Sequence, residues 1–457
     1  LLLVAGGLGA FFVLSRAPWG LALSAARDAP AAAAALGVEH GRLEFRTFTA
    51  SAMVCGLAGA LSVQLAGVAD PTAYGPLLSV ELFAAVLLGG VGRPLGPVVG
   101  AAGLLLIPSV AEALGSIAGL SAERFEPAVA SLLLVAALVI GRGGILGWAK
   151  LARERLAGRK GGSGRAVTSP SEAGHPESNG TTTPEAWKAS IAVEAPDSAG
   201  EGGPLLEATG LEKRFGGVVA LDDVDLHVAP GEIRGLIGPN GSGKTTLLRI
   251  LGGTVEADGG RIAFAGRDLT HNPTTERVRA GLVRTLQRVS VSPSLSVREN
   301  VLVGATTRRR YGGGLRSLTL TPLARSEERT ITAQADALLS LVGLRNAADR
   351  YPRELVGTEQ RFVMLAAACA SFPRLLLLDE PSAGMSRTEL ERLVAVIAGI
   401  RSEGVAVVLV EHNLRLVRLL ADHVTVLDAG RIVAEGTPDE ISRHRGVVEA
   451  YLGRRGM

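Results

Sequence analysis

The stretch GPNGSGKTT, residues 238–246, constrains the fold of this chain more than any other. It matches the spacing G-x-x-x-x-G-K-[ST], follows the apolar run IRGLI and leads into the helical pattern TTLLRIL. Glycines in such a loop let backbone N–H groups converge on phosphate oxygens, and the N-terminus of the following helix adds a favourable dipole. The context predicts a strand, a phosphate-binding loop and a helix, and therefore an α/β nucleotide-binding domain.

Two side chains of this loop can contact ATP and its metal ion. The Lys244 ammonium can contact the β- and γ-phosphates, and the Thr245 hydroxyl can ligate Mg²⁺. A merely glycine-rich turn is the alternative, and the flanking strand and helix argue against it. The predicted nucleotide-binding residues of the loop are Gly238, Pro239, Asn240, Gly241, Ser242, Gly243, Lys244, Thr245 and Thr246.

The run LLLLDEPSAG supplies the second half of a nucleotide site. Four leucines predict a buried strand, which delivers Asp379 and Glu380 at its carboxyl end, where α/β sheets bind ligands. Asp379 can then hold the Mg²⁺ shell, and Glu380 can polarise the attacking water. A solvated acidic turn is the alternative for an isolated Asp-Glu pair.

Local composition divides the chain into three segments. Residues 205–457 alternate short apolar strands, such as EIRGLIG, RLLLLDE, VAVVLVE and HVTVLDA, with helical patterns, which predicts a mostly parallel sheet. Residues 158–204 are rich in Gly, Ser, Thr, Pro and Glu and predict a flexible linker. Residues 1–157 are strongly apolar and predict an α-helical transmembrane domain, in a chain whose mean hydropathy is +0.30. The fold class is therefore multi-domain.

The membrane segment contains four apolar stretches, at about 48–68, 77–92, 95–114 and 125–141. Lys and Arg gather before the first and after the last, so both flanks should be cytoplasmic, and four crossings satisfy this. A multi-pass protein of the cell membrane with a cytoplasmic ATPase domain and lipid contacts is expected. The net charge of +3 gives no general case for nucleic-acid binding.

The first residues, LLLVAGGLGAFFVLSR, carry neither the basic segment nor the small-residue site of a signal peptide. The apolar run is shorter than the roughly 20 residues of a spanning helix. We interpret it as the end of a transmembrane helix, and the transmembrane domain as truncated at its N-terminus.

The order of motifs resembles the nucleotide-binding domain of an ABC transporter: KRFGG, GPNGSGKTT, RTLQ, LVGTEQR, LLLLDEP and VEHN. More narrowly, RFGGVVALDDVDLHVAPGEI and VLDAGRIVAEGTPDEI resemble the ATPase subunits of branched-chain amino acid importers. The stretches VELFAAVLLGGVGRPLGPVVGA and GRGGILG resemble the C-terminal half of the permease subunit of the same systems. The resemblance covers nearly everything except the linker.

The resemblance implies further roles. Phe215 would stack on adenine, and Gln287 would lie near Mg²⁺ and sense the membrane domain. His412 would contact the γ-phosphate and position Glu380. The stretch AARDAPAAAAALGV resembles the permease's coupling helix, with Gly37 at the family's glycine; an ordinary amphipathic interfacial helix is the alternative.

One motif departs from the family. The signature turn L-S-x-G-[QE] reads Leu355, Val356, Gly357, Thr358 and Glu359 here. In the family, the serine hydroxyl and the glycine N–H groups of this turn approach the γ-phosphate of ATP bound by the opposite subunit. Val356 lacks that hydroxyl, and Thr358 adds a Cβ where the backbone must come close to the phosphate. Loss of such a hydrogen bond costs about 1.5–3 kcal/mol, or about tenfold to a hundredfold.

These ATPases work as pairs, so the defect would fall on the nucleotide of the partner. The resemblance therefore implies a heterodimer with a second ATPase subunit, a second permease subunit and an extracytoplasmic solute-binding protein. Branched-chain amino acids are the implied solutes. Three alternatives stay open. The solute is urea or a short amide, the protein is an exporter, or it is an ATP-sensing membrane regulator with little hydrolysis.

Overall fold

The structure, a computed structural model, describes residues 2–68, 75–90, 95–106, 109, 203–308 and 322–444. Two compact units divide the chain: residues 1–49 together with 182–457, and residues 50–181. Residues 110–202 lie outside the described part, so the linker and the domain boundaries stay predictions.

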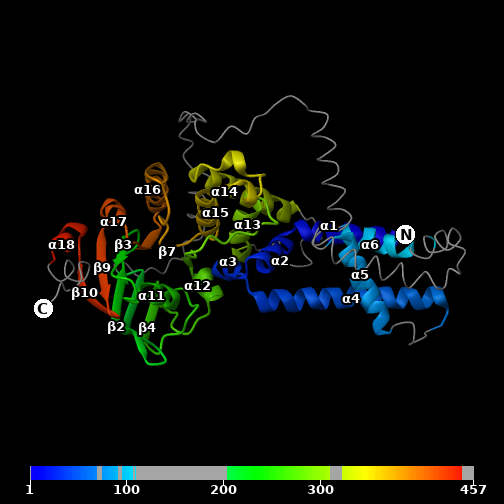
Figure 1. Ribbon diagram of the computed structural model, residues 1–457, viewed down its shortest axis with the longest axis horizontal. Coiled ribbons are helices and arrows are strands. Elements are labelled where there is room, and N and C mark those ends of the chain that lie inside the picture. Colours follow the sequence, from blue (N-terminus) through cyan, green and yellow to red (C-terminus); the bar gives the residue numbers. More distant parts are fainter. Residues whose placement is uncertain are drawn as a thin grey trace, which may run out of the picture. The chain divides into compact units, whose positions relative to one another are not determined.

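The larger sheet of the first unit has six strands in the order β10-β9-β3-β8-β7-β6 (Figure 1). They are β3 (Ile233–Ile237), β6 (Leu282–Arg284), β7 (Leu375–Asp379), β8 (Ala406–Val410), β9 (His423–Asp428) and β10 (Arg431–Gly436). All neighbours are parallel except β10, which pairs antiparallel with β9. The predicted mostly parallel sheet is confirmed, and the four apolar runs named above are β3, β7, β8 and β9.

Both faces of this sheet are apolar because side chains alternate along each strand and helices cover both sides. In β7, Leu375 and Leu377 join a core that includes Leu247 of α11 (Lys244–Leu251). Leu376 and Leu378 join the opposite core, which includes Ile397 of α16 (Arg387–Ser402). A run of four leucines is therefore the sequence expected of a strand buried on both faces.

The smaller sheet is antiparallel, in the order β2-β1-β4-β5. Its strands are β1 (Leu206–Phe215), β2 (Val218–Val228), β4 (Gly259–Phe264) and β5 (Arg267–Asp268). Leu206 and Leu211 bury one face against the core that contains α11. This antiparallel sheet was not predicted from the sequence.

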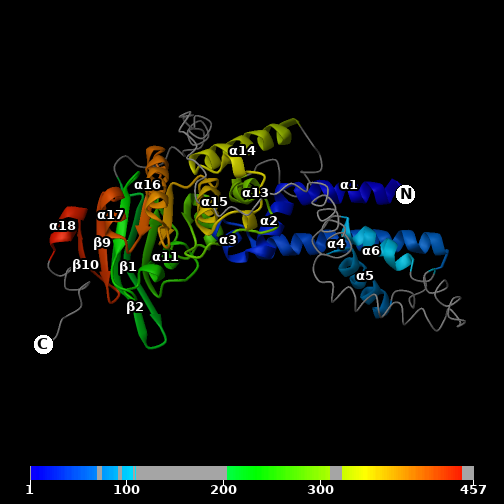
Figure 2. The same ribbon diagram turned by 45° about the horizontal axis from the view of Figure 1, so that its top comes forward.

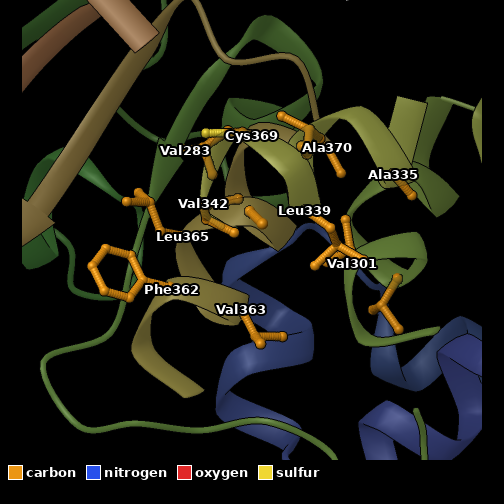
Figure 3. Packing of buried hydrophobic residues seen from close by; sticks show 14 of the residues in the cluster. Val283, Val301, Ala335, Leu339, Val342, Phe362, Val363, Leu365, Cys369 and Ala370 are labelled. Carbon is orange, nitrogen blue, oxygen red and sulfur yellow. The ribbon is translucent and has the colours of Figure 1, made fainter. Parts of the chain in front are cut away.

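The remaining helices of the ATPase part are α12 (Thr274–Ala280), α13 (Val297–Gly304), α14 (Pro322–Leu341), α15 (Gly357–Cys369), α17 (Leu414–Leu420) and α18 (Pro438–Arg443), with 3₁₀ turns η2 (Ala305–Arg308), η4 (Arg345–Ala347) and η5 (Pro352–Glu354). Helices α13, α14 and α15 lie together (Figure 2). Their shared core is closely packed: Val301, Leu339 and Val363 come from three different helices (Figure 3).

Three N-terminal helices belong to the same unit: α1 (Leu2–Arg16), α2 (Pro18–Asp28) and α3 (Pro30–Ala35). Proline opens both α2 and α3, a position where its missing N–H costs nothing. Leu21, Ala25 and Ala33 are buried in the core formed by α13 and α15. Helices α2 and α3 therefore pack directly on the ATPase part.

Among the described residues, one helix is long and apolar enough to cross a membrane: α4 (His40–Ala66), 27 residues long. It covers the first predicted span, and its apolar side chains are exposed, as Phe48, Met53 and Leu57 show. The next two spans are represented by the shorter helices α5 (Pro76–Gly89) and α6 (Gly96–Leu105). The end of the third predicted span and all of the fourth lie outside the described residues.

Candidate nucleotide site and its connection to the N-terminal helices

The phosphate-binding loop connects β3 to α11, as its sequence predicts. Gly238 has a φ of +151°, and a Cβ there would lie 1.9 Å from the carbonyl oxygen of Leu427. Only glycine fits at this position, because the loop passes against the end of β9. Gly243, the last residue before α11, also has a positive φ.

Lys244 is buried in the loop that it belongs to. Its Nζ donates hydrogen bonds to the carbonyl oxygens of Gly238 and Pro239, at 2.8 Å each. Burial lowers the pKa of the lysine, while the nearby carboxylates of Glu380 and Asp379 act in the opposite direction. Lys244 of the loop therefore lies near both acids at the end of β7.

Asp379 ends β7 and is almost completely buried. Its Oδ2 accepts a hydrogen bond from Nη2 of Arg284, at the end of β6, over 2.9 Å. Its other oxygen, Oδ1, is buried and has no hydrogen-bond partner among the described residues. A carboxylate oxygen in this condition is suited to a cation or to water bound by one.

Glu380 is held by two of the residues predicted to act with it. Its Oε1 lies 2.7 Å from Nε2 of His412, and its Oε2 accepts a hydrogen bond from Nε2 of Gln287 over 2.9 Å. Its backbone has a φ of +49°, which is rare for a residue with a side chain. The backbone N–H of Glu380 donates to the carbonyl oxygen of Val410 on β8, which fixes this conformation.

The pKa of Glu380 is lowered. Partial burial raises it, but the hydrogen bonds from Gln287 and His412, with the charges of His412 and Lys244, lower it by more. Glu380 therefore carries its negative charge at neutral pH and can accept a proton from water.

Phe215 and Thr245 are two further residues with predicted contacts to nucleotide or Mg²⁺. Phe215 ends β1, and its ring is half exposed, with Nζ of Lys213 5.5 Å from the ring centroid. Thr245 lies in the first turn of α11 and is partly buried. The adenine contact of Phe215 and the Mg²⁺ contact of Thr245 stay predictions.

The altered signature turn precedes and opens α15. Val356 is 63% exposed, so it presents an apolar surface where the family has a hydroxyl. The Thr358 hydroxyl donates to Oε1 of Glu389 on α16, at 2.5 Å. Oε2 of Glu389 in turn accepts from the backbone N–H of Ser386, which caps α16. Thr358 thus joins the starts of α15 and α16.

One carboxylate gathers several polar contacts between the N-terminal helices and the ATPase part. Oδ2 of Asp28 accepts hydrogen bonds from the hydroxyl of Ser292, at 2.5 Å, and from both the hydroxyl and the N–H of Ser294. Burial raises the pKa of Asp28, but the serine hydrogen bonds and Arg27 lower it by more. Asp28 is therefore charged where it meets the two serines.

The same interface continues past α3. Gly37 has a φ of +83°, and a Cβ there would lie 2.9 Å from side-chain carbons of Val278 and Thr307. Nη2 of Arg279 pairs with Oε1 of Glu39 at 2.7 Å. The stretch predicted to resemble a coupling helix therefore contacts α12, η2 and the segment before α13.

Some contacts of the site were missed. Arg284 could have been noticed as a charged residue in the otherwise apolar strand LVR. Arg361 of α15 donates to the carbonyl oxygen of Pro381, just after Glu380, over 3.0 Å. Oε1 of Glu411 accepts from the N–H of Ser382 over 2.8 Å. Neither of the last two has a local sequence signal.

The phosphate-binding loop follows β3 of a mostly parallel sheet, His412 follows the neighbouring strand β8, and the acid pair lies at the end of β7, one strand further. This arrangement defines an ATP-binding cassette. A model of the ABC transporter family matches residues 221–383. A model described as "Branched-chain amino acid transport system / permease component" matches residues 1–140. A third, "Branched-chain amino acid ATP-binding cassette transporter", matches residues 431–456.

The chain is also similar to individual proteins. The chain is 39% identical over 251 residues to the high-affinity branched-chain amino acid transport ATP-binding protein BraF of Pseudomonas aeruginosa, covering 55% of this chain and 98% of BraF. It is 36% identical, with the same coverage, to LivG of Escherichia coli K12, which carries the same description. Among solved structures, a nucleotide-free ATP-binding cassette from an ABC transporter is 30% identical, with a TM-score of 0.47 over 55% of this chain and all of that chain.

The chain belongs to the ABC transporter family. It joins a permease segment of the branched-chain amino acid transport type to the ATP-binding subunit of the same type. The α/β part is an ABC ATPase that binds nucleotide, and the permease segment makes the chain part of a membrane transporter. The predicted family and fold class are confirmed.

Proposed function

We propose that this chain uses ATP hydrolysis to import branched-chain amino acids across the cytoplasmic membrane. The observation that carries the proposal is the hydrogen-bonded contact of Asp28, within the permease match, with Ser292 and Ser294 of the ATPase match. A contact of this kind lets a change in the ATPase act on the membrane part. The names of the relatives support the solute.

For hydrolysis, Glu380 is the base that polarises the attacking water. His412 and Gln287 orient its carboxylate, since each occupies one of its oxygens. The loop from Gly238 to Thr246 binds the phosphates, and Phe215 stacks on the adenine. The ring of Phe215 is half exposed, so it has apolar surface available for a base.

The residues present fit a bound Mg²⁺ ion. Asp379 has a buried oxygen without a partner, and Gln287 uses its amide nitrogen on Glu380, which leaves its amide oxygen for a cation. Thr245 adds a hydroxyl from the first turn of α11. Bound there, the ion would neutralise the charge on the β- and γ-phosphates.

Residues 25–38 act as the coupling segment, which transmits changes between the two parts. Its docking is specific in both chemistry and shape, because Asp28 meets two hydroxyls and Gly37 fits where a side chain would collide. Gln287 lies only a few residues before Ser292, so the docked surface is continuous in sequence with the loop that holds Glu380.

The working assembly is an asymmetric ATPase heterodimer. This chain gives a full set of Lys244, Asp379, Glu380 and His412 to one site. Its own signature turn completes the other site, which hydrolyses slowly because Val356 offers no hydroxyl. A second permease subunit and an extracytoplasmic solute-binding protein complete the importer. The membrane part is multi-pass and in contact with lipid, and the ATPase part is cytoplasmic.

The test is uptake by the assembled transporter in proteoliposomes with its solute-binding protein. We expect ATP-dependent accumulation of labelled leucine, isoleucine or valine, and its loss in Glu380→Gln with nucleotide binding retained. Accumulation of urea or short amides instead would show that these, and not branched-chain amino acids, are the transported solutes. Full ATP turnover in the Glu380→Gln assembly would place the active site elsewhere and refute the proposed asymmetry. ATP binding without turnover in the wild type would indicate a regulator.

A further inference from the structure

The ion pair between Arg284 and Asp379 lies in the interior of the ATPase. The exposed fractions of the two side chains are 8% and 0%. β6 and β7 are parallel neighbours, with Arg284 opposite Leu377, so the arginine reaches along the sheet to the end of β7. Because removing two charges from water is costly, such a pair adds little stability, and a functional reason is needed.

The pair is one-sided. Nη2 of Arg284 occupies only Oδ2 of Asp379, and Oδ1 is left buried without a partner among the described residues. Arginine commonly binds a carboxylate through two parallel hydrogen bonds, which would use both oxygens. The observed arrangement fixes the rotation of the carboxylate and keeps one oxygen unused.

The arginine is itself held in place. Its Nη1 contacts Oγ1 of Thr254 at 3.4 Å, just past the end of α11. A Cβ on Gly252 would lie 3.1 Å from Cδ of Arg284, so the side chain passes close to this glycine. Arg284 therefore connects the end of β7, through Asp379, with the residues that follow α11, through Thr254. α11 is the helix whose first turn carries Lys244 and Thr245.

We propose that Arg284 is a positioning residue of the magnesium site. It holds Asp379 through Oδ2 and so presents Oδ1 to the hydration shell of Mg²⁺ bound with ATP. Arg284 itself touches neither metal nor nucleotide. This inference rests on the proposed Mg²⁺ role of Asp379. Residues that orient metal ligands in this way typically change metal affinity by about tenfold to a hundredfold when altered.

The test separates orientation from charge. Arg284→Lys keeps the positive charge but replaces the planar guanidinium by a shorter point donor. In the full chain in lipid nanodiscs, with a non-hydrolysable ATP analogue, Mn²⁺ replaces Mg²⁺, and free Mn²⁺ is counted by electron paramagnetic resonance. We expect Mn²⁺ to bind about tenfold more weakly in Arg284→Lys. Binding of the analogue in EDTA should be unchanged, because the arginine does not contact nucleotide.

Arg277 offers a matched control. It is a second buried arginine, but it donates only to backbone carbonyl oxygens, those of Ile250, Leu251, Thr270 and Asn272. Arg277→Lys should lower Tm and leave Mn²⁺ binding unchanged. Equal Mn²⁺ affinity in Arg284→Lys and wild type would overturn the positioning role, as would an equal loss in Arg277→Lys. If Asp379→Asn leaves Mn²⁺ binding intact, the proposed metal role of Asp379 fails instead.

Discussion

The hydroxyl of Thr358 donates a hydrogen bond to Oε1 of Glu389 at 2.5 Å, which ties the signature turn to the start of α16. In the family this position holds a glycine whose backbone approaches the partner's ATP. The substitution is therefore built into the chain's own packing. The hydrogen bond from Thr358 lowers the pKa of Glu389, and the hydrogen bonds from Ser386 lower it further.

Restoring the family sequence should raise the activity of the weaker site. We expect Val356→Ser with Thr358→Gly to increase ATP turnover of the assembled heterodimer when the stronger site is inactivated by Glu380→Gln. The gain should be about tenfold, from one recovered hydrogen bond to a phosphate. Turnover is measured by phosphate release. Thr358→Ser keeps the bond to Glu389 and should change nothing; no gain in the double variant would show that this turn does not limit hydrolysis.

His412 should control both the rate and its pH dependence. We expect His412→Ala to lower kcat by about tenfold to a hundredfold, with a small change in KM. This factor corresponds to the free energy of one hydrogen bond to a charged group. The lowered pKa of Glu380 keeps it ionised into mildly acidic solution. Removing the hydrogen bond and charge of His412 lets that pKa rise, so the acid limb of the kcat profile moves to higher pH.

The control for this experiment is His227→Ala, since His227 is an exposed histidine of β2. It should leave the profile unchanged. A His412→Ala protein with an unshifted acid limb would mean that His412 does not act through Glu380.

Asp28 should be needed for coupling more than for hydrolysis. Asp28→Asn replaces charged acceptors of the Ser292 and Ser294 hydrogen bonds by a neutral amide. We expect solute uptake per ATP hydrolysed to fall about tenfold while ATP binding stays normal. Arg27→Ala removes the 3.3 Å hydrogen bond to the Ser294 hydroxyl and the 3.0 Å ion pair with Oδ1 of Asp28. It leaves the serine hydrogen bonds of Oδ2 in place and should have a smaller effect. Unchanged uptake in Asp28→Asn would contradict the proposed coupling segment.

Cys369 should be chemically inert in the folded protein. It is fully buried in the core of α15, and burial raises its pKa to about 12. In a Cys55→Ala chain, which keeps only Cys369, we expect no maleimide labelling at pH 8 and full labelling in denaturant, because the thiol is protonated and inaccessible. Rapid labelling of the native chain would show that the α13–α15 core opens.

The sequence allowed much of the ATPase fold to be predicted, because its signals are local. Alternating strands and helices indicated the parallel sheet, and the four leucines before Asp379 indicated a strand buried on both faces. The antiparallel sheet was missed because its strands carry mixed polar and apolar residues without a strong motif. The second predicted span, 77–92, extends a few residues past the end of α5 at Gly89, since hydropathy gives the extent of apolar sequence and not where a helix ends.

By itself, the sequence determined which residues can bind phosphate and which can act as acid or base, since these depend on residue type and spacing along the chain. Only the tertiary structure decided that Gln287 and His412 occupy the two oxygens of Glu380. The same holds for Arg284 and Asp379, 95 residues apart, and for Asp28 and Ser292, 264 residues apart. Such contacts arise because burial brings distant segments together, and buried polar groups must then find partners there.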